Sequence, residues 1–316
     1  MSKVYITDYI VNPNVEKKIL GEYFEKDIEN KEIEVLLVWN QVIDEEFLKK
    51  FPKLKGIVRY GVGYDKISIE AVKKRKLVVC NTPDYAMEEV SDTALGMLLN
   101  ITRGLNLYDY ISRKSIEKWK QNTPIKEIKR NKVNKIGVIG AGRIGSLFIK
   151  KVQSIGFDVF YYDPYLIEDI NYGNRVKYLD ELLSLSDIVS IHTPLTDETL
   201  NMIDENFLSK MKMGSSIINT ARGKIIKNLD IIYDCLISNR LYSIAFDVLP
   251  EEPPHKNKLI TSWLDRDELS PRILINPHVS YYSGESFIEC REKASSNALL
   301  IINNDEPKNI IYDFRK

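Results

Sequence analysis

The stretch KIGVIGAGRIGSLFIKKVQSIGFDVFYYD, residues 135–163, decides the fold of the chain. It begins with a short apolar run at residues 136–139, which leads directly into the glycine pattern GAGRIG at 140–145. Apolar residues then recur at a spacing of three and four up to Gly156, and a second apolar run ends at Asp163. A strand, a glycine turn, a helix and a second strand in this order predict a βαβ unit that binds a dinucleotide.

Each glycine of this pattern has a separate physical task. Gly140 makes the tight turn, Gly142 lets the backbone approach a pyrophosphate, and Gly145 allows the helix to pack closely on the strand. The pyrophosphate then lies against the unpaired N–H groups at the start of the helix. Two alternatives share this pattern: a glycine-rich turn that binds no ligand, and an S-adenosylmethionine site of the methyltransferase type.

Asp163 predicts which dinucleotide binds. It lies 23 residues beyond Gly140, at the end of the second strand. Its carboxylate can accept both ribose hydroxyls of an adenosine, whereas it would repel a 2′-phosphate. The sequence therefore predicts NAD rather than NADP.

Size and charge limit the class of protein. The chain has 316 residues, 45 Lys and Arg against 45 Asp and Glu, 44% apolar and 28% charged residues. The length predicts about two domains, and the composition is that of a globular protein. The zero net charge argues against a nucleic-acid or anionic-membrane partner, since both require an excess of cations.

Cysteine usage and the N-terminus predict a cytoplasmic protein. The three cysteines are odd in number and widely spaced, which suits a reducing compartment and gives neither a disulfide framework nor a CxxC metal knuckle. The first eight residues, MSKVYITD, do not resemble a secretion signal, and the apolar runs are too short to span a bilayer. We expect no catalytic metal.

The rest of the chain alternates short apolar runs with helical patterns, which predicts an α/β protein with parallel sheets. The polar and basic segment 121–135 is interpreted as a solvated connection rather than as a phosphate or nucleic-acid patch. Helices are predicted at 84–103, 106–120 (ending near Trp119) and 285–303. The predicted strands cover 4–7, 35–39, 56–60, 77–80, 136–139, 159–162, 188–191, 216–219, 244–246, 273–275 and 309–312.

Polar residues follow the six strands predicted between residues 136 and 275. Ligands of an open parallel sheet bind beyond the carboxyl ends of the strands, so these residues are candidates for one site. In chain order they are Gly140–Gly145, Asp163, His192-Thr193-Pro194, Thr220-Ala221-Arg222-Gly223, Asp247 and Asn276-Pro277-His278.

A reactive group is present within this set. Hydride transfer to a ketone leaves an alkoxide that needs a proton near neutral pH, and His278 is the natural donor. An acid from the pair Glu251-Glu252 would fix the tautomer of the imidazole, and Arg222 would grip a substrate carboxylate. Of the other histidines, His255 is interpreted as solvated, and His192 as lining the cofactor rather than taking part in the chemistry.

The chain resembles the D-isomer-specific 2-hydroxyacid dehydrogenase family, which includes D-3-phosphoglycerate, glycerate and D-lactate dehydrogenases. The resemblance covers essentially the whole chain. It rests on RYGVGYD at 59–65, NTP at 81–83 with EVSD at 89–92, GAGRIG at 140–145, HTPLTDETLNMI at 192–203, INTARG at 218–223, AFDVLPEEPP at 245–254 and NPH at 276–278.

The resemblance implies a role for each matching residue. Arg222 binds the carboxylate and keto oxygen of the substrate, Glu252 is the acid that matches the family pattern, and His278 is the general acid and base. The backbone N–H groups of Val62 and Gly63 receive the substrate carboxylate. The implied substrate-binding residues are Tyr60, Val62, Gly63, Arg222 and Tyr281. The implied cofactor-binding residues are Gly140, Gly142, Arg143, Ile144, Gly145, Asp163, His192, Thr193, Pro194, Thr199, Thr220, Ala221, Arg222, Asp247 and His278, with Asp247 holding the nicotinamide carboxamide.

The resemblance also implies a fold of two Rossmann-like or flavodoxin-like domains with parallel sheets. Residues 1–103 together with 287–316 would form a substrate domain that is discontinuous in sequence, and residues 104–286 the NAD-binding domain. The expected activity is hydride transfer between NAD and a small D-2-hydroxy acid or 2-keto acid, by a homodimer formed through the NAD-binding domain.

One departure from the family pattern leaves an alternative open. After His278 the chain reads VSYYS at 279–283, where many members of the family have a small, glycine-rich stretch. This stretch is closer to the C-terminal-binding-protein corepressors, so the alternative function is an NAD(H)-sensing scaffold without significant turnover. An aromatic side chain at Tyr281 is also expected to narrow the substrate end of the pocket or to stack there.

Overall fold

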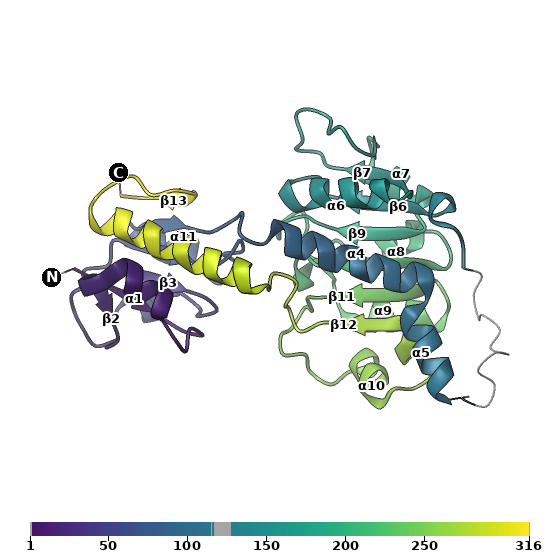
Figure 1. The fold of residues 1–316 in the computed structure, drawn as a ribbon, viewed down its shortest axis with the longest axis horizontal. Coiled ribbons are helices and arrows are strands. Elements are labelled where there is room, and N and C mark those ends of the chain that lie inside the picture. Colours follow the sequence, from purple (N-terminus) through teal and green to yellow (C-terminus); the bar gives the residue numbers. More distant parts are fainter. Residues whose placement is uncertain (1, 115, 117–127, 316) are drawn as a thin grey trace. The chain divides into compact units, whose positions relative to one another are not determined.

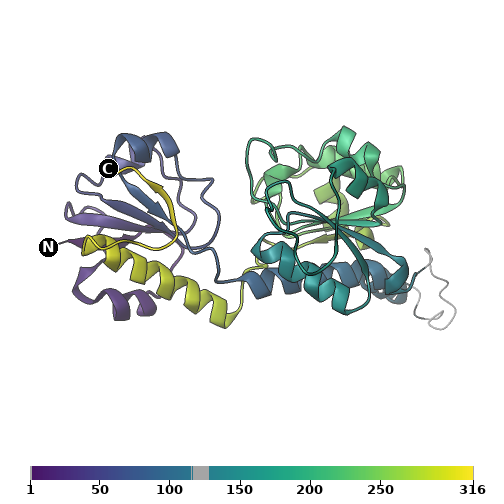
Figure 2. The same ribbon diagram turned by 90° about the horizontal axis from the view of Figure 1, so that it is seen from above.

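A computed structural model describes residues 2–114, 116 and 128–315, which form two compact units (Figures 1 and 2). The first unit consists of Met1–Ala86 together with Tyr282–Lys316, and the second consists of Met87–Tyr281. The chain therefore leaves the first unit, builds the second and returns. Residues 121–127 of the segment 121–135 and the expected helix end at Trp119 lie outside the described residues.

The unit boundaries differ from those expected at residues 103 and 286. Helix α4 (Met87–Arg103) belongs to the second unit because its apolar face is buried there, against helix α6 (Arg143–Ser154) and the sheet. Ala94, Met97 and Leu98 lie in one core cluster with sheet residues of the second unit. At the other boundary, Ser283 caps helix α11 (Gly284–Ile302), which packs on the first unit.

The sheet of the second unit is parallel throughout, with the strand order β12-β11-β10-β9-β6-β7-β8. Its strands are β6 (Lys135–Ile139), β7 (Asp158–Tyr162), β8 (Asn174–Arg175), β9 (Ile188–Ile191), β10 (Ser215–Asn219), β11 (Leu241–Phe246) and β12 (Ile273–Ile275). The chain builds outward from β6 in one direction through β7 and in the other through β9. The carboxyl ends of β6 and β9 therefore flank the point where a doubly wound sheet opens a crevice.

Helices cover both faces of this sheet, as Figure 2 shows. Helices α4 and α6 share a core with one face, where Val138 and Ile218 point, while Ile191, Ile217 and Phe246 point into the core on the other face. The helices on that second face include α7 (Leu179–Leu185), α8 (Glu205–Lys210), α9 (Leu229–Ile237) and α10 (Lys258–Asp265). Helix α5 (Leu105–Lys114) follows α4 and has no fully buried residue.

The sheet of the first unit has the order β13-β5-β4-β3-β1-β2. The expectation of parallel sheets is confirmed for β1 to β5, and the edge strand β13 is the exception, since it runs antiparallel to β5. Strand β13 starts beside Cys80, at the carboxyl end of β5, and ends beside Val78, so it can only run against β5. The strands are β1 (Lys3–Ile6), β2 (Phe24–Glu25), β3 (Ile33–Val38), β4 (Gly56–Arg59), β5 (Val78–Cys80) and β13 (Ile310–Asp313).

Helices α1 (Asn14–Leu20) and α11 pack together on one face of the first unit's sheet, and α2 (Glu45–Leu48) and α3 (Ile69–Lys74) cover the other. Among the described residues, no helix is long and apolar enough to cross a membrane.

A buried ion pair joins α1 to α11. The Glu16 carboxylate is fully buried and accepts two hydrogen bonds from the Arg291 guanidinium, at 2.8 and 2.6 Å. It also accepts a hydrogen bond of 3.0 Å from the Tyr60 hydroxyl, and burial beside this carboxylate raises the pKa of Tyr60 well above its ordinary value. The pair therefore fixes the residue that precedes the turn after β4.

We expect Arg291→Ala to lower the free energy of unfolding by about 3–5 kcal/mol, because it leaves the Glu16 carboxylate buried without its cation. The exposed pair Lys74–Glu45 provides the control, and Lys74→Ala is expected to change the free energy of unfolding little, because solvent screens this pair. Urea unfolding measures both. A double variant with Glu16→Gln should recover part of the loss; equal losses in the single and double variants would contradict this explanation.

Candidate active site

The strand ends of the second unit lie in register. Ile139, Tyr162, Ile191, Asn219, Phe246 and Ile275 are successive partners across six neighbouring strands. The residues that follow them therefore project from one edge of one sheet. This edge holds the glycine loop, Asp163, His192, Arg222, Asp247 and His278.

The glycine loop is packed tightly except at Gly142. Gly140 adopts a φ of +90°, and a Cβ atom there would lie 2.6 Å from the backbone oxygen of His192. A Cβ atom on Gly145 would lie 2.0 Å from the backbone oxygen of Gly140, so the helix approaches the turn as closely as a glycine permits. A Cβ atom on Gly142 would meet nothing within 4 Å. The open side of the loop is therefore at Gly142.

Helix α6 begins directly after Gly142, with Arg143 and Ile144 in its first turn. Among the described residues, no side chain caps this helix. The N–H groups of the first turn thus remain available, together with the positive end of the helix dipole, for an anion such as a pyrophosphate. The residues present fit a dinucleotide at this position.

Asp163 is held against the glycine loop. One oxygen of its carboxylate accepts the Ala141 N–H and the other accepts the Tyr165 N–H, each at 2.9 Å. These bonds fix the direction of the carboxylate while leaving acceptor capacity on both oxygens. A carboxylate held beside the glycine loop with free acceptor capacity suits ribose hydroxyls.

His192 supports the loop from below. Its Nε2 lies 2.8 Å from the Ser190 hydroxyl, and its ring packs 4.8 Å from the ring of Phe148. Burial lowers the pKa of His192 to about 3, so the imidazole is neutral at physiological pH. It therefore packs beneath the glycine loop as a neutral ring.

Thr193 and Pro194 begin the loop after β9, and Thr199 closes it. The Thr199 hydroxyl lies 2.7 Å from the backbone oxygen of Pro194 and accepts the Thr196 N–H at 2.8 Å. The structure thus uses Thr199, which the family pattern assigns to the cofactor, to shape this loop. Threonine hydroxyls often form hydrogen bonds within their own turn. The sequence motif alone does not distinguish this structural role from a contact with a ligand.

The Arg222 loop is fixed from both sides. The Asn219 side chain donates to the backbone oxygen of Arg222 and accepts the Ala221 N–H, both at 3.0 Å. A Cβ atom on Gly223 would lie 1.8 Å from the backbone oxygen of Leu249, so this loop packs directly against the segment that leads to Glu252. The half-buried Arg222 guanidinium donates to the backbone oxygen of Ala221 at 2.7 Å.

His278 and Glu252 form a hydrogen-bonded pair. The Nδ1 atom of His278 lies 2.7 Å from one oxygen of the Glu252 carboxylate, and the other oxygen accepts the Leu249 N–H at 3.0 Å. Glu251 instead lies 3.6 Å from His255, where both side chains are exposed. The structure therefore pairs the histidine with Glu252, which leaves Nε2 as the ring atom directed away from the carboxylate.

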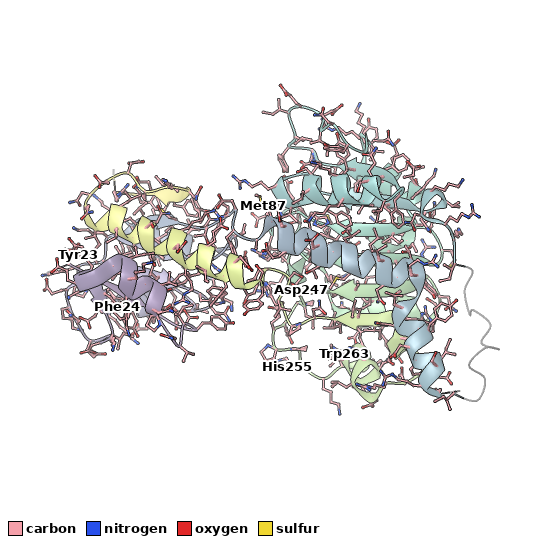
Figure 3. All side chains as sticks on the ribbon, viewed as in Figure 1. Tyr23, Phe24, Met87, Asp247, His255 and Trp263 are labelled. Carbon is pink, nitrogen blue, oxygen red and sulfur yellow. The ribbon has the colours of Figure 1, made fainter. Side chains whose placement is uncertain are left out.

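Asp247 organises the loop that carries His278. Its buried carboxylate accepts the N–H groups of Val279 and Ser280, and its backbone oxygen accepts the His278 N–H at 2.8 Å. Figure 3 marks Asp247 beyond the end of β11, with His255 further along the chain. These bonds hold His278 at a φ of +56°, a conformation that is unfavourable for a residue other than glycine.

Two buried hydroxyls near this loop have no protein partner among the described residues, namely Thr220 and Ser280. Thr220 directly follows β10, and Ser280 is held by Asp247, the residue that follows the neighbouring β11. Buried hydroxyls are normally hydrogen-bonded, so a polar ligand group such as a carboxamide suits this place.

The first unit carries its own anion-binding geometry. Gly61 has a φ of +109°, its N–H donates to the Thr82 hydroxyl at 2.5 Å, and the Asn81 side chain donates to the backbone oxygen of Val62 at 2.8 Å. Within the described part of the chain, the N–H groups of Val62 and Gly63 have no hydrogen-bond partner. Two successive unpaired N–H groups form a concavity suited to a carboxylate.

The Tyr60 side chain lies in the interior of the first unit. It is fully buried and bonds Glu16, so we assign it the positioning of the turn at 61–63 in place of the expected contact with substrate. The sequence motifs missed Asn81 and Thr82 as supports of this turn. Both residues belong to the motif NTP, directly after a predicted strand, and this position could have indicated that they contact a neighbouring turn. Tyr281 is half-buried at the end of the second unit.

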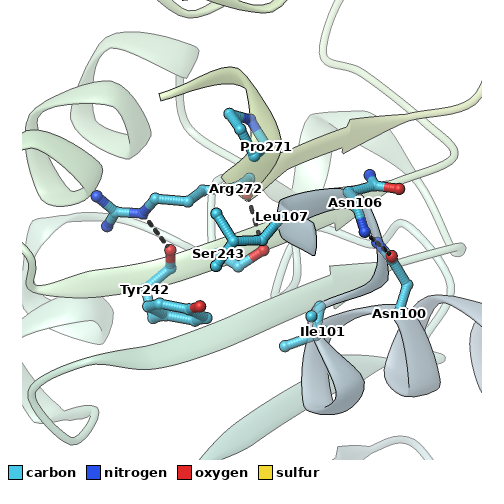
Figure 4. Close-up of a pocket in the computed structure, with 9 residues that line it drawn as sticks. Asn100, Ile101, Asn106, Leu107, Tyr242, Ser243, Pro271 and Arg272 are labelled. Atoms are coloured by element: carbon cyan, nitrogen blue, oxygen red, sulfur yellow. Dashed lines mark hydrogen bonds between the residues drawn. The ribbon is translucent and has the colours of Figure 1, made fainter. Parts of the chain in front are cut away.

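A pocket at the opposite edge of the second unit's sheet is separate from this site (Figure 4). Its volume of about 10 Å³ admits no more than a single water molecule. Arg272 crosses it and donates to the backbone oxygen of Tyr242, at the start of β11. Across the described residues, no group of His, Cys, Asp and Glu could hold a metal ion.

The fold and the site define a nicotinamide-dependent oxidoreductase. Residues 95–280 match the family model "D-isomer specific 2-hydroxyacid dehydrogenase, NAD binding domain", and the chain belongs to this family. The comparisons do not favour a scaffold without turnover.

The similar proteins include enzymes that reduce or oxidise small acids. A glyoxylate reductase of Korarchaeum cryptofilum is 30% identical over 274 residues, which cover 85% of this chain and 79% of that protein. A glyoxylate reductase of Thermofilum pendens is 29% identical over 307 residues, which cover 96% of this chain and 88% of that protein. A similar solved structure is the crystal structure of D-lactate dehydrogenase from Aquifex aeolicus complexed with NAD and lactic acid. It has a TM-score of 0.84 and 27% sequence identity, and the match covers 98% of this chain and 99% of that chain.

The neutral His192 predicts an acid-sensitive fold. Its pKa is about 3 when folded, against about 6.5 when unfolded, so below pH 6.5 the unfolded state binds a proton that the folded state does not. The free energy of unfolding should therefore fall by about 2 kcal/mol between pH 7 and pH 5 from this residue alone.

Comparison of the wild-type chain with His192→Gln by urea unfolding at several pH values measures this contribution. The variant should lack it, so that the stability difference between the two proteins narrows as the pH falls from 7 to 5. Parallel pH profiles would contradict the assignment of a neutral, buried imidazole.

Proposed function

We propose that the protein is an NAD-dependent D-2-hydroxyacid dehydrogenase that interconverts a small 2-keto acid and the D-2-hydroxy acid. The observation that carries the proposal is the His278–Glu252 hydrogen bond of 2.7 Å, at the same sheet edge as Arg222 and the dinucleotide loop. A nicotinamide cofactor, when bound, supplies or accepts the hydride.

His278 holds and moves the proton. Because Nδ1 bonds the Glu252 carboxylate, Nδ1 carries a hydrogen and Nε2 is the atom that exchanges a proton with the substrate oxygen. In the direction of reduction, protonated Nε2 donates to the developing alkoxide. In the direction of oxidation, neutral Nε2 removes the hydroxyl proton. Glu252 stabilises the imidazolium and fixes the orientation of the ring.

Substrate binding is assigned to Arg222 and to the turn after β4. The planar guanidinium of Arg222 suits a carboxylate and polarises the adjacent carbonyl. Within the first unit, the unpaired N–H groups of Val62 and Gly63 offer a place for a carboxylate group. These residues recognise the 2-keto acid group that all candidate substrates share.

We assign NAD rather than NADP on the basis of Asp163. Its carboxylate is fixed beside the glycine loop by the Ala141 N–H, where the adenosine ribose binds in this type of site. A 2′-phosphate there would face a charge of the same sign.

The relatives named above support a small substrate such as glyoxylate or lactate, and the half-buried Tyr281 is proposed to limit the size of the substituent. A homodimer through the second unit is supported by helix α5, which has no fully buried residue and exposes 57% of Leu105. The three free cysteines suit the reducing cytoplasm, which is the proposed location.

The central test is the rate of NADH oxidation with a panel of 2-keto acids: glyoxylate, pyruvate, hydroxypyruvate, phosphohydroxypyruvate and larger branched or aromatic acids. We expect turnover with at least one small acid, and His278→Asn should lower it by at least roughly 10²-fold, because the proton donor is removed. NADH binding should be retained. Tight NADH binding without turnover on the panel would instead support the scaffold function.

Arg222→Ala should raise KM and lower kcat together, because the guanidinium binds the substrate in both the ground state and the transition state. Steady-state kinetics with the best substrate of the panel measures both constants. Lys224→Ala, on the same loop but exposed, is the matched control and should change neither. Unchanged kinetics in Arg222→Ala would remove this residue from the site.

A further inference from the structure

A hydrogen bond joins the two loops on either side of the dinucleotide loop. The hydroxyl of Tyr165, after β7, donates to the carboxylate of Glu198, in the loop after β9. The Tyr165 side chain is 73% exposed, so the bond forms at the surface of the second unit. Glu198 lies within the motif HTPLTDETLNMI at 192–203, whereas Tyr165 lies in none of the motifs quoted above.

The sheet order places this bond over the candidate cofactor site. Strand β6 lies between β7 and β9, and the glycine loop projects from its carboxyl end. A bond from the β7 loop to the β9 loop therefore passes above the end of β6. That is the place where a doubly wound sheet binds its ligand.

Both partners are anchored to residues of the site. The Tyr165 N–H donates to Asp163, the ribose-binding carboxylate of the proposed function. Glu198 belongs to the turn that Thr196 and Thr199 close below Pro194. The backbone at each of the two residues is thus held by hydrogen bonds, on opposite sides of the proposed adenosine position.

We propose that Tyr165 and Glu198 form a clasp over the adenosine of bound NAD, and that the Glu198 carboxylate is a second determinant of NAD specificity. The proposal rests on the proposed function, which places NAD in this site. The clasp slows release of the cofactor. Its carboxylate, together with Asp163, surrounds the adenosine ribose with two negative charges.

The charges of the neighbouring side chains support this role. The hydrogen bond to Glu198 raises the pKa of Tyr165, and a phenol, whose ordinary pKa is about 10, is in any case protonated and able to donate at neutral pH. The nearby cation Arg175 donates to Asp169 and to the backbone oxygens of Asp163 and Leu166. It is thus engaged with the loop after β7, on the side of Asp163.

Two substitutions separate the bond from the charge. Tyr165→Phe removes the bond and keeps both carboxylates, and it should raise the dissociation rate of NADH about threefold to tenfold, as expected for the loss of one hydrogen bond. Glu198→Gln keeps an acceptor for Tyr165 and removes the charge. It should shift the ratio of NADPH to NADH affinity about threefold to tenfold toward NADPH.

Matched controls are available on the same surfaces. Asp197→Asn removes an exposed carboxylate one residue from Glu198, and Tyr178→Phe removes an exposed phenol elsewhere on the second unit. Neither should change the dissociation rate or the affinity ratio. Stopped-flow fluorescence gives the dissociation rate, equilibrium titration gives both affinities, and Asp163→Ala is the positive control for the affinity ratio.

The outcomes separate the clasp from the proposed function. If wild-type protein binds NADH and Asp163→Ala shifts the affinity ratio, but Tyr165→Phe and Glu198→Gln behave like their controls, the clasp is overturned and the proposed function stands. If the wild-type chain binds neither NADH nor NADPH, both fail. A change in dissociation rate without a change in ratio overturns the specificity role of Glu198 alone.

Discussion

The close approach of Gly145 to the backbone oxygen of Gly140 is the contact on which the site depends. Any side chain at Gly145 would push helix α6 away from β6 and withdraw its first-turn N–H groups from the strand end. Strand β6 lies between β7 and β9 in the sheet. The contact therefore fixes the start of helix α6 at the carboxyl end of this central strand. The register across six strands then places Asp163, Arg222 and His278 beyond the same line.

The candidate site combines residues that act on ligands with residues that hold them in place. Asp247, Asn219 and the backbone of Leu249 form hydrogen bonds that fix the loops of His278, Arg222 and Glu252. His192 belongs to the same supporting set, as a neutral ring that packs beneath the glycine loop. The motifs of the family thus contain both kinds of residue, and only geometry distinguishes them.

Much of the fold could be predicted from the sequence because buried parallel strands are short apolar runs with polar residues at their ends. The glycine loop, Asp163 and the pairing of an acid with His278 follow from the same reasoning. The boundary at Met87 could not be predicted, since the periodicity of α4 shows that one face is buried but not on which sheet. The antiparallel β13, the Glu16–Arg291 pair and the Tyr165–Glu198 bond depend on contacts between residues far apart in the chain, which no local pattern records.

The turn at Gly61–Gly63 presents main-chain N–H groups, and its supports are Asn81 and Thr82, which lie in another segment of the chain. The side chain of Val62 takes no part in these bonds and is 41% exposed. Residue 62 can therefore change in size or polarity while the main-chain donors stay in place. The side chain at position 62 and the main-chain donors of the turn are therefore independent of one another, so a substitution at this surface position leaves the hydrogen-bonding geometry of the turn unchanged.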